Sequence, residues 1–192
     1  MKTLRAPLDR QEAVRFYVGY DCRKKLRPLP RDLADWNWDD PDDLDARLER
    51  HGLKPGAVSA YKLWSFVELC VLDLLHCAIA RHVFKGQPQV LSLLAARGAV
   101  ETWKPQGLPE WFDSLQAGDA FPQEWAMILR PSTVTEQPAE WYVEDGTGRA
   151  LCFLQRVLGH AESRRVAYAY LGVVPDESSN FIRSRPELAK LR

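Results

Sequence analysis

The chain has 192 residues, of which 46% are apolar and 27% are charged, as in an ordinary globular protein with one core or two. Its 26 Lys and Arg residues balance its 26 Asp and Glu residues, so the formal net charge is zero. This balance argues against broad, nonspecific binding to nucleic acid, which needs a basic surface, and DNA is therefore not an expected partner.

The first fifty residues divide into a basic and an acidic segment. Residues 1–31 hold nine Lys and Arg residues against three Asp and Glu residues, with the densest run at 23–27. Residues 32–50 hold eight Asp and Glu residues against two Arg residues. Within the basic segment, we expect residues 11–20 to form a short helix or a strand.

The acidic segment predicts a helix over 41–50. Pro41 suits its first turn, and either Asp39 or Asp40 suits its N-cap. Gly52 would end the helix. The acidic cluster could bind a metal ion, imitate the surface of a nucleic acid or contact a protein partner. It could equally be a solvent-exposed helix start that pairs with the basic segment.

The longest apolar stretch predicts a long buried helix over 60–84. Apolar residues recur there at helical spacing and cover most of the helix circumference. Charged residues interrupt the stretch, so we expect neither a membrane span nor a membrane partner. Asp73 and His76 would share one face of this helix, either as an acid–base pair or as a structural contact.

The cysteines and the N-terminal residues bear on the cellular compartment. The four cysteines are scattered and form no Cys-x-x-Cys pair, so we expect reduced thiols and no metal site. The opening residues, MKTLRAPLDR, contain no apolar signal region. These features predict a cytoplasmic protein.

Shorter elements are expected in the middle of the chain. The pattern predicts helices over 89–97 and 107–118 and a strand over 125–129. A soft boundary near 98–107 would separate a mainly helical N-terminal region, 1–100, from a small α/β core, 101–192. The expected fold class is therefore α+β, with an N-terminal helical unit packed on a mixed-sheet core.

The most informative stretch of the chain is 141–174. It predicts a strand from Trp141, a glycine-rich turn, a helix over 150–158 and a second strand over 166–174. A strand–helix–strand unit of this kind places both strands in one sheet, and we expect them to be parallel or nearly so.

The turn in this stretch consists of Asp145, Gly146, Thr147, Gly148 and Arg149. Backbone N–H groups in the first turn of a helix have no helical partner and carry partial positive charge. The two glycines would let a ligand approach closely, and Thr147 adds a hydroxyl. Arg149 adds a planar set of donors suited to phosphate or carboxylate. The turn therefore predicts an anion site.

Acidic residues beside the turn complicate this interpretation. Glu144 and Asp145 would repel an anion, but either one could act as a general base or hold Arg149 in place. Arg130 would add a second phosphate contact if the strand before it pairs with 141–144, and would otherwise be an exposed loop residue. The glycines could also serve turn geometry alone, with Asp145 capping the helix.

The stretch resembles the signature of the ParB/sulfiredoxin-like superfamily. In that family a strand ends in Asp-Gly, two variable residues and Arg, and a helix that ends near Leu-Gly leads to a second strand. The matching positions here are Asp145, Gly146, Arg149, Leu158, Gly159 and the strand from Val166. The second variable position, often His or Arg in the family, is Gly148 here. The resemblance implies a phosphate or nucleotide pocket at this turn.

Three functions remain open at this level. The resemblance implies a phosphate- or nucleotide-binding protein, with phosphoryl transfer or nucleotide hydrolysis at the turn and a nucleoside triphosphate with Mg²⁺ as its ligand. Asp145 and Glu144 would then be catalytic, and Arg130 would join the turn in binding. The alternatives are a non-catalytic protein-interaction module that kept the fold, with a protein partner at 32–50, and a DNA-binding or nuclease-like relative.

Overall fold

The computed structural model describes residues 1–54, 56, 58–79, 89–91, 121–133, 136, 138–160 and 166–173. The chain divides into two compact units. The central unit comprises Met1–Lys2 and Val67–Ala169, and the terminal unit comprises Thr3–Phe66 and Tyr170–Arg192. Three strands, β1, β2 and β7, contribute residues to both units.

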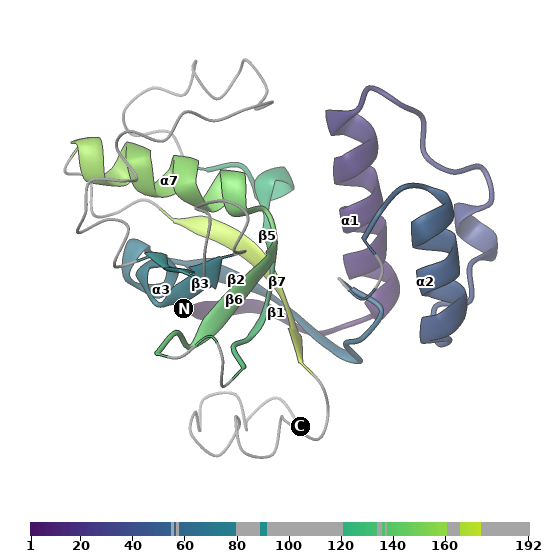
Figure 1. The fold of residues 1–192 in the computed structure, drawn as a ribbon, viewed down its shortest axis with the longest axis horizontal. Helices are drawn as coiled ribbons and strands as arrows, with labels where there is room; N and C mark the ends of the chain where they lie inside the picture. Colours follow the sequence, from purple (N-terminus) through teal and green to yellow (C-terminus); the bar gives the residue numbers. More distant parts are fainter. Residues whose placement is uncertain are drawn as a thin grey trace. The chain divides into compact units, whose positions relative to one another are not determined.

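Helices and strands alternate irregularly along the chain (Figure 1). The first elements are β1 (Lys2–Leu8), α1 (Arg10–Lys24), η1 (Leu33–Asp35), α2 (Pro41–Arg50), β2 (Leu63–Leu69), α3 (Val71–Leu75), β3 (Cys77–Ile79) and β4 (Gln89–Val90). The later ones are η3 (Gln123–Trp125), β5 (Met127–Pro131), β6 (Trp141–Asp145), α7 (Thr147–His160) and β7 (Ala167–Val173). The described part of the chain is therefore α+β, as the sequence predicts.

The sheet is mixed. The strand order in the central unit is β7-β5-β6-β3-β4, and in the terminal unit it is β1-β2-β7. β3 runs parallel to β6, with Cys77 opposite Trp141, whereas β5 runs antiparallel to β6, with Ile128 opposite Asp145. The strands β6 and β7 share a sheet, as predicted, but they are not neighbours because β5 lies between them.

The core of the central unit forms between α7 and the strands. Leu151, Leu154 and Val157 recur at helical spacing on α7 and are buried, with Leu151 and Leu154 fully inaccessible to solvent. The helix packs against β5 and α3. Phe153 of α7 meets Phe121 edge to face, with ring centroids 5.2 Å apart. Burial of these apolar side chains is the main force that holds α7 on the sheet.

The terminal unit has its own core, to which α1 and α2 contribute. Asp9 caps α1 by accepting a hydrogen bond from the Gln11 amide at 3.0 Å, so the expected short helix or strand at 11–20 is a helix. The buried guanidinium of Arg10 donates to the carbonyl oxygens of Tyr61 and Trp38, both at 2.9 Å. These bonds satisfy a charge that would otherwise be costly to bury.

Helix α2 confirms the helix predicted over 41–50. Its N-cap is Asp40, whose carboxylate accepts from the amides of Asp42 at 3.0 Å and Asp43 at 3.3 Å. The structure thus decides between the two candidate caps. Gly52 follows with φ +70°, the left-handed conformation that glycine supplies at helix ends.

The end of α1 is unusual because a leucine takes the place expected for glycine. The Arg27 amide donates to the Cys22 carbonyl at 2.9 Å, and the Leu26 amide donates to the Arg23 carbonyl at 3.1 Å. This pair of bonds defines a Schellman motif, whose left-handed residue is normally glycine. Here that residue is Leu26, with φ +52°. A left-handed leucine costs about 1 kcal/mol.

The prediction of a long helix over 60–84 is wrong. Residues 63–79 form β2, the short helix α3 and β3. The segment Leu63–Leu69 is rich in aromatic and aliphatic residues, and Trp64, Phe66 and Leu69 are buried. A strand buried on both faces has apolar residues without a clean period of two, and a helix buried all round looks the same in sequence.

The remaining predictions divide between confirmed and undescribed elements. The strand predicted over 125–129 is present as β5, shifted by two residues. In the segment predicted to be a helix over 89–97, residues 89–90 form the strand β4 instead and Leu91 is helical, whereas 92–97 lie outside the described residues. The helix over 107–118 and the boundary near 98–107 also lie outside them. Among described residues, no helix is both long and apolar enough to cross a membrane.

Candidate functional site

The predicted strand–turn–helix junction is present in the central unit. β6 ends at Asp145, Gly146 makes the turn with φ +96°, and α7 begins at Thr147. The Ala150 amide donates to the Gly146 carbonyl at 2.9 Å, which is the first helical hydrogen bond. Thr147 and Gly148 lie half-buried in the first turn of α7.

Arg149 is a buried residue of this turn. Its side chain is only 2% exposed. One terminal nitrogen donates to the carboxylate of Asp145, and the other donates to the carbonyl oxygen of Ala126, just before β5. The guanidinium therefore joins the end of β6, the start of β5 and the first turn of α7. Of the three roles that the sequence leaves to Asp145, the ion pair corresponds to holding Arg149 in place.

Gly146 makes room for that arrangement. A Cβ atom at this position would lie 2.9 Å from Nε of Arg149 and 2.9 Å from Cγ of Met127. Real Cβ atoms almost never approach other atoms so closely. The positive φ adds a second reason for glycine, because other residues rarely adopt it. Here the glycine serves both the turn and the buried arginine beneath it.

Glu144 and Asp145 have different surroundings although they are adjacent in sequence. Successive side chains of a strand point to opposite faces of a sheet. Asp145 pairs with Arg149, whereas Glu144 accepts a hydrogen bond from Nε of Arg130 at 2.9 Å. The two predicted catalytic carboxylates therefore belong to separate ion pairs on separate faces of β6.

Arg130 lies toward the end of the β5–β6 pair that is farther from the turn at Gly146. β5 pairs with β6, as the sequence argument required, but the pairing is antiparallel, with Arg130 opposite Tyr142. The start of β5, not its end, is therefore beside the turn. Arg130 forms a bidentate pair with Glu136, at 2.7 and 2.8 Å, and its guanidinium lies 3.9 Å from the ring centre of Tyr142.

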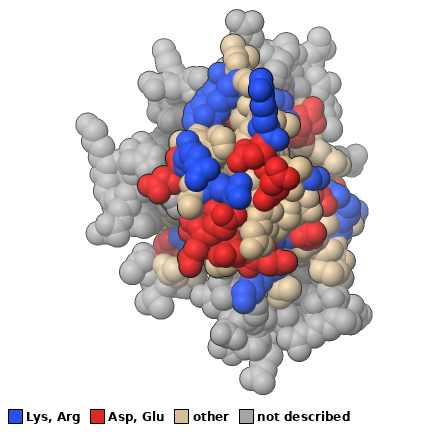
Figure 2. Space-filling view, turned by 90° about the vertical axis from the view of Figure 1, so that its right-hand side faces the viewer, with Lys and Arg blue, Asp and Glu red and all other residues tan. Residues whose placement is uncertain are grey.

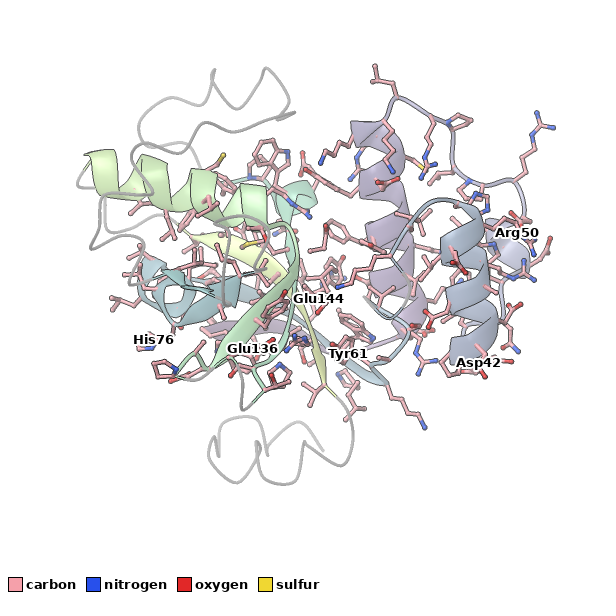
Figure 3. The ribbon with its side chains drawn as sticks, viewed as in Figure 1. Asp42, Arg50, Tyr61, His76, Glu136 and Glu144 are labelled. Carbon is pink, nitrogen blue, oxygen red and sulfur yellow. The ribbon has the colours of Figure 1, made fainter. Side chains whose placement is uncertain are left out.

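The acidic partners of Arg130 come from two places in the chain. Glu144 is on β6, and Glu136 is in the connection between β5 and β6 (Figure 3). Sequence reasoning did not identify Glu136 or Tyr142 as members of this cluster. The sequence carries one signal for Glu136, which is that Thr133 lies three residues before it. At this spacing a backbone amide can donate to a nearby side chain, and here the Thr133 amide donates to the Glu136 carboxylate at 2.7 Å.

The ion pairs shift the ionisation of this cluster. Burial alone would raise the pKa of the Glu136 carboxyl, but the hydrogen bonds from Arg130 and the Thr133 amide outweigh burial and lower that pKa. Burial would lower the pKa of Arg130, and its two glutamate partners instead raise it. Both groups are therefore charged at neutral pH, and each stabilises the charge of the other.

The charged groups of the candidate site form ion pairs with one another. Arg149 and Arg130 face three carboxylates, those of Asp145, Glu144 and Glu136. An incoming phosphate would have to displace a carboxylate to reach either guanidinium, in a cluster whose own net charge is negative. The arrangement can hold strands and helix together, and in this conformation it opposes an anionic ligand.

Other candidate residues have structural partners. Asp73 caps α3, because its carboxylate accepts from the Cys70 amide at 2.9 Å. Burial raises the pKa of the Cys77 thiol, which makes that cysteine a poor nucleophile. In the part of the chain that the structure describes, no three His, Cys, Asp or Glu residues gather in a group that could hold a metal ion.

The acidic segment uses several carboxylates for its own fold. Arg47 of α2 pairs with Asp43 at 2.8 Å and with Asp32 at 3.1 Å. Asp45 accepts hydrogen bonds from Ser59 and from the Gly56 amide. The carboxyl-bearing residues that stay exposed are Asp35, Asp39, Asp40, Asp42 and Glu49. Asp42 and Arg50 mark the two ends of α2 (Figure 3), and the face seen in Figure 2 carries Asp and Glu side chains across its middle.

Comparison of the chain with protein-family models, with curated proteins and with solved structures finds no match.

Proposed function

We propose that this protein is a non-catalytic binding module of ParB/sulfiredoxin-like type. The observation that carries the proposal is the state of Arg149, the arginine of the resemblance. It is buried, and it donates to Asp145 and to the Ala126 carbonyl. The turn resembles that of the family, but its arginine stabilises the protein itself. We expect this combination in a protein that kept the fold after it lost the ability to bind or transfer phosphate.

The surroundings of the turn support the same proposal. A phosphoryl-transfer site needs cationic donors that face the developing negative charge of the substrate. Here Arg130 is bound by two glutamates, and Glu144 and Asp145 lie on separate faces of the strand. Gly148 also supplies no side chain at the second variable position. No pair of these groups is arranged to act together on one ligand.

The partner that we propose is a protein with a basic surface. The exposed carboxylates around α2 would meet it, and electrostatic attraction between opposite charges would speed and orient the encounter. None of the cysteines, Cys22, Cys70, Cys77 and Cys152, is paired in a disulfide, which fits the reducing environment of the cytoplasm. We therefore propose a cytoplasmic interaction protein.

The first test measures ligand binding at the turn. The melting temperature would be recorded with inorganic phosphate and with a panel of nucleoside triphosphates, each with and without Mg²⁺. We expect no ligand-dependent rise, because Arg149 already has protein partners. A rise that depends on Mg²⁺ and is lost in Arg149→Lys would overturn the proposal.

A second candidate, nucleotide or phosphate binding, is favoured by one observation. α7 is a 14-residue helix that begins directly after Gly146 at the end of a strand, and the first-turn amides of such a helix have no helical partner. Such binding would rest on the backbone of Gly146, Thr147 and Gly148, with Asp145 displaced from Arg149. The same ligand panel decides between the two candidates, because only this one predicts stabilisation by phosphate.

The second test addresses the protein partner. The tagged full chain would be compared in affinity capture with a variant carrying Asp39→Asn, Asp42→Asn and Glu49→Gln, which removes exposed charge but keeps the cap residue Asp40. We expect a bound protein that the triple variant loses and that Arg149→Lys retains. Equal capture by the triple variant and the unchanged chain would exclude the acidic surface as the interface.

A further inference from the structure

The turn that ends α1 exposes an apolar side chain at an energetic cost. Leu26 is 95% exposed, and it occupies the left-handed position of a Schellman motif, where glycine is the usual residue. Leu29, three residues later, is 52% exposed. The three backbone hydrogen bonds of the turn, from Lys25, Leu26 and Arg27, hold the tip in place. A leucine fixed in water in an unfavourable conformation suggests a role outside the fold.

Basic residues flank this leucine in the sequence. Residues 21–31 contain five Lys and Arg residues and one Asp, a net charge of +4. The exposed members are Arg23, Lys24, Lys25 and Arg31. Asp21 is the acidic residue, and it pairs with Lys25 at 3.0 Å and with Arg27. The cations therefore exceed the acid that lies among them, and they flank the apolar tip on both sides.

We propose that the turn of residues 23–31 docks on the surface of a bilayer that contains anionic phospholipid. The Lys and Arg side chains would bind the negative headgroups, and Leu26, with Leu29 beside it, would enter the boundary between headgroups and acyl chains. This proposal revises the expectation that the protein has no membrane partner. That expectation rested on the absence of an uncharged membrane span, which reversible association with a membrane surface does not need. The proposal is independent of the function proposed for the turn at Gly146.

The distribution of charge orients this contact. In Figure 2, Lys and Arg side chains gather toward the top of the displayed face, whereas Asp and Glu side chains cross its middle. The exposed acids of the neighbouring segment are Asp35, Asp39, Asp40, Asp42 and Glu49. A negative bilayer would attract the basic turn and repel the acidic segment, so the protein would approach with Leu26 foremost.

A lipid surface explains the leucine better than a nucleic acid does. Nucleic acid would attract the same basic side chains, but its phosphates and sugars offer no apolar environment to a leucine. Insertion into the hydrocarbon boundary removes apolar surface from water, which is the favourable change available to an exposed leucine. The leucine therefore distinguishes the two anionic partners.

The test uses the full chain and sedimenting vesicles of two compositions, phosphatidylcholine alone and an equimolar mixture of phosphatidylcholine and phosphatidylserine. We expect binding to the mixed vesicles at low salt, loss of binding at high salt, and no binding to phosphatidylcholine alone. Leu26→Gly keeps the turn, since glycine suits the left-handed conformation, and should weaken vesicle binding about tenfold. The double variant Lys24→Gln, Arg31→Gln should weaken it by at least as much.

Matched controls make the outcome decisive. Leu72 is 64% exposed on α3, so Leu72→Gln removes an exposed leucine elsewhere and should leave vesicle binding unchanged. Failure to bind mixed vesicles at low salt would overturn the proposal, and so would equal binding by Leu26→Gly. Retention on duplex DNA that Leu26→Gly does not alter, without vesicle binding, would assign the basic turn to nucleic acid instead.

Discussion

Nε of Arg149 lies 2.9 Å from the point where a Cβ atom would be built on Gly146. The arginine folds back under the turn toward Asp145 and the Ala126 carbonyl, and the glycine leaves the space that this requires. The two residues that most strongly suggest an anion site in the sequence thus fit against one another. Because of this mutual fit, substitutions at Gly146 and Arg149 are expected to change stability rather than turnover.

Gly146→Ala should lower the free energy of unfolding by about 3 kcal/mol, because the new methyl group meets Arg149 and Met127 and because φ is positive. Gly56→Ala is the matched control. Gly56 also has a positive φ, +75°, but a Cβ there would meet no atom within 4 Å. The control should lose only about 1 kcal/mol. Denaturant unfolding measures both, and equal losses would show that the close contact at Gly146 has no energetic effect.

Arg149→Ala should cost about 3 kcal/mol of stability, since it leaves the Ala126 carbonyl and the Asp145 carboxylate without their donor. Arg31→Ala, at an exposed position, should cost less than about 0.5 kcal/mol. Thermal and denaturant unfolding provide the measurement. An Arg149→Ala protein as stable as the original would mean that the guanidinium is available for a ligand.

The lowered pKa of the Glu136 carboxyl predicts that the stability of the protein depends on pH. Because its pKa is lowered in the folded protein, its contribution is fully present above the unfolded carboxyl pKa of about 4.3. That contribution is lost as the pH falls through the lower folded pKa. Glu136→Gln should therefore be less stable than the unchanged protein at neutral pH, and the difference should shrink as the solution is acidified below pH ~4.

Denaturant midpoints measured across this pH range test the prediction. Glu124→Gln, at an exposed position, serves as the control and should leave the pH profile of stability unchanged. A constant difference between Glu136→Gln and the unchanged protein down to the lowest pH would contradict the assigned pairing with Arg130.

Asp40→Ala should destabilise the protein by about 1 kcal/mol, the usual loss when a helix N-cap is removed. Asp39→Ala should have almost no effect, because it is Asp40 whose carboxylate accepts from the first-turn amides of α2. Far-ultraviolet circular dichroism during thermal unfolding would compare the two. The opposite order of effects would place the cap one residue earlier.

Leu26→Gly should raise stability by about 0.5 kcal/mol, because relief of the left-handed leucine exceeds the entropy that glycine adds to the unfolded chain. Leu26→Ala should give no gain, since alanine has the same difficulty with a positive φ. Melting temperatures of the two variants check this point independently of any lipid. Destabilisation by glycine would show that Leu26 makes a contact important to the fold.

Local patterns in the sequence were enough to predict several elements. Capping, spacing and composition predict the start of α2 at a proline among acidic residues, its end before Gly52, the apolar face of α7, and the aromatic and aliphatic strands β6 and β7. The junction at Asp145 and Gly146 follows in the same way, since strand, glycine and helix are consecutive in the chain. Each of these features depends on residues within a few positions of one another.

Only the tertiary structure decided which residues meet across longer distances. The stretch 63–79 is too evenly apolar for its period to separate helix from strand, so pairing within the sheet determined its conformation. Arg130 and Glu144 meet because β5 is antiparallel to β6, and Arg149 reaches Ala126 because the start of β5 lies beside the turn. Register and strand direction are properties of the whole sheet, which is why the sequence could identify these charges but not their partners.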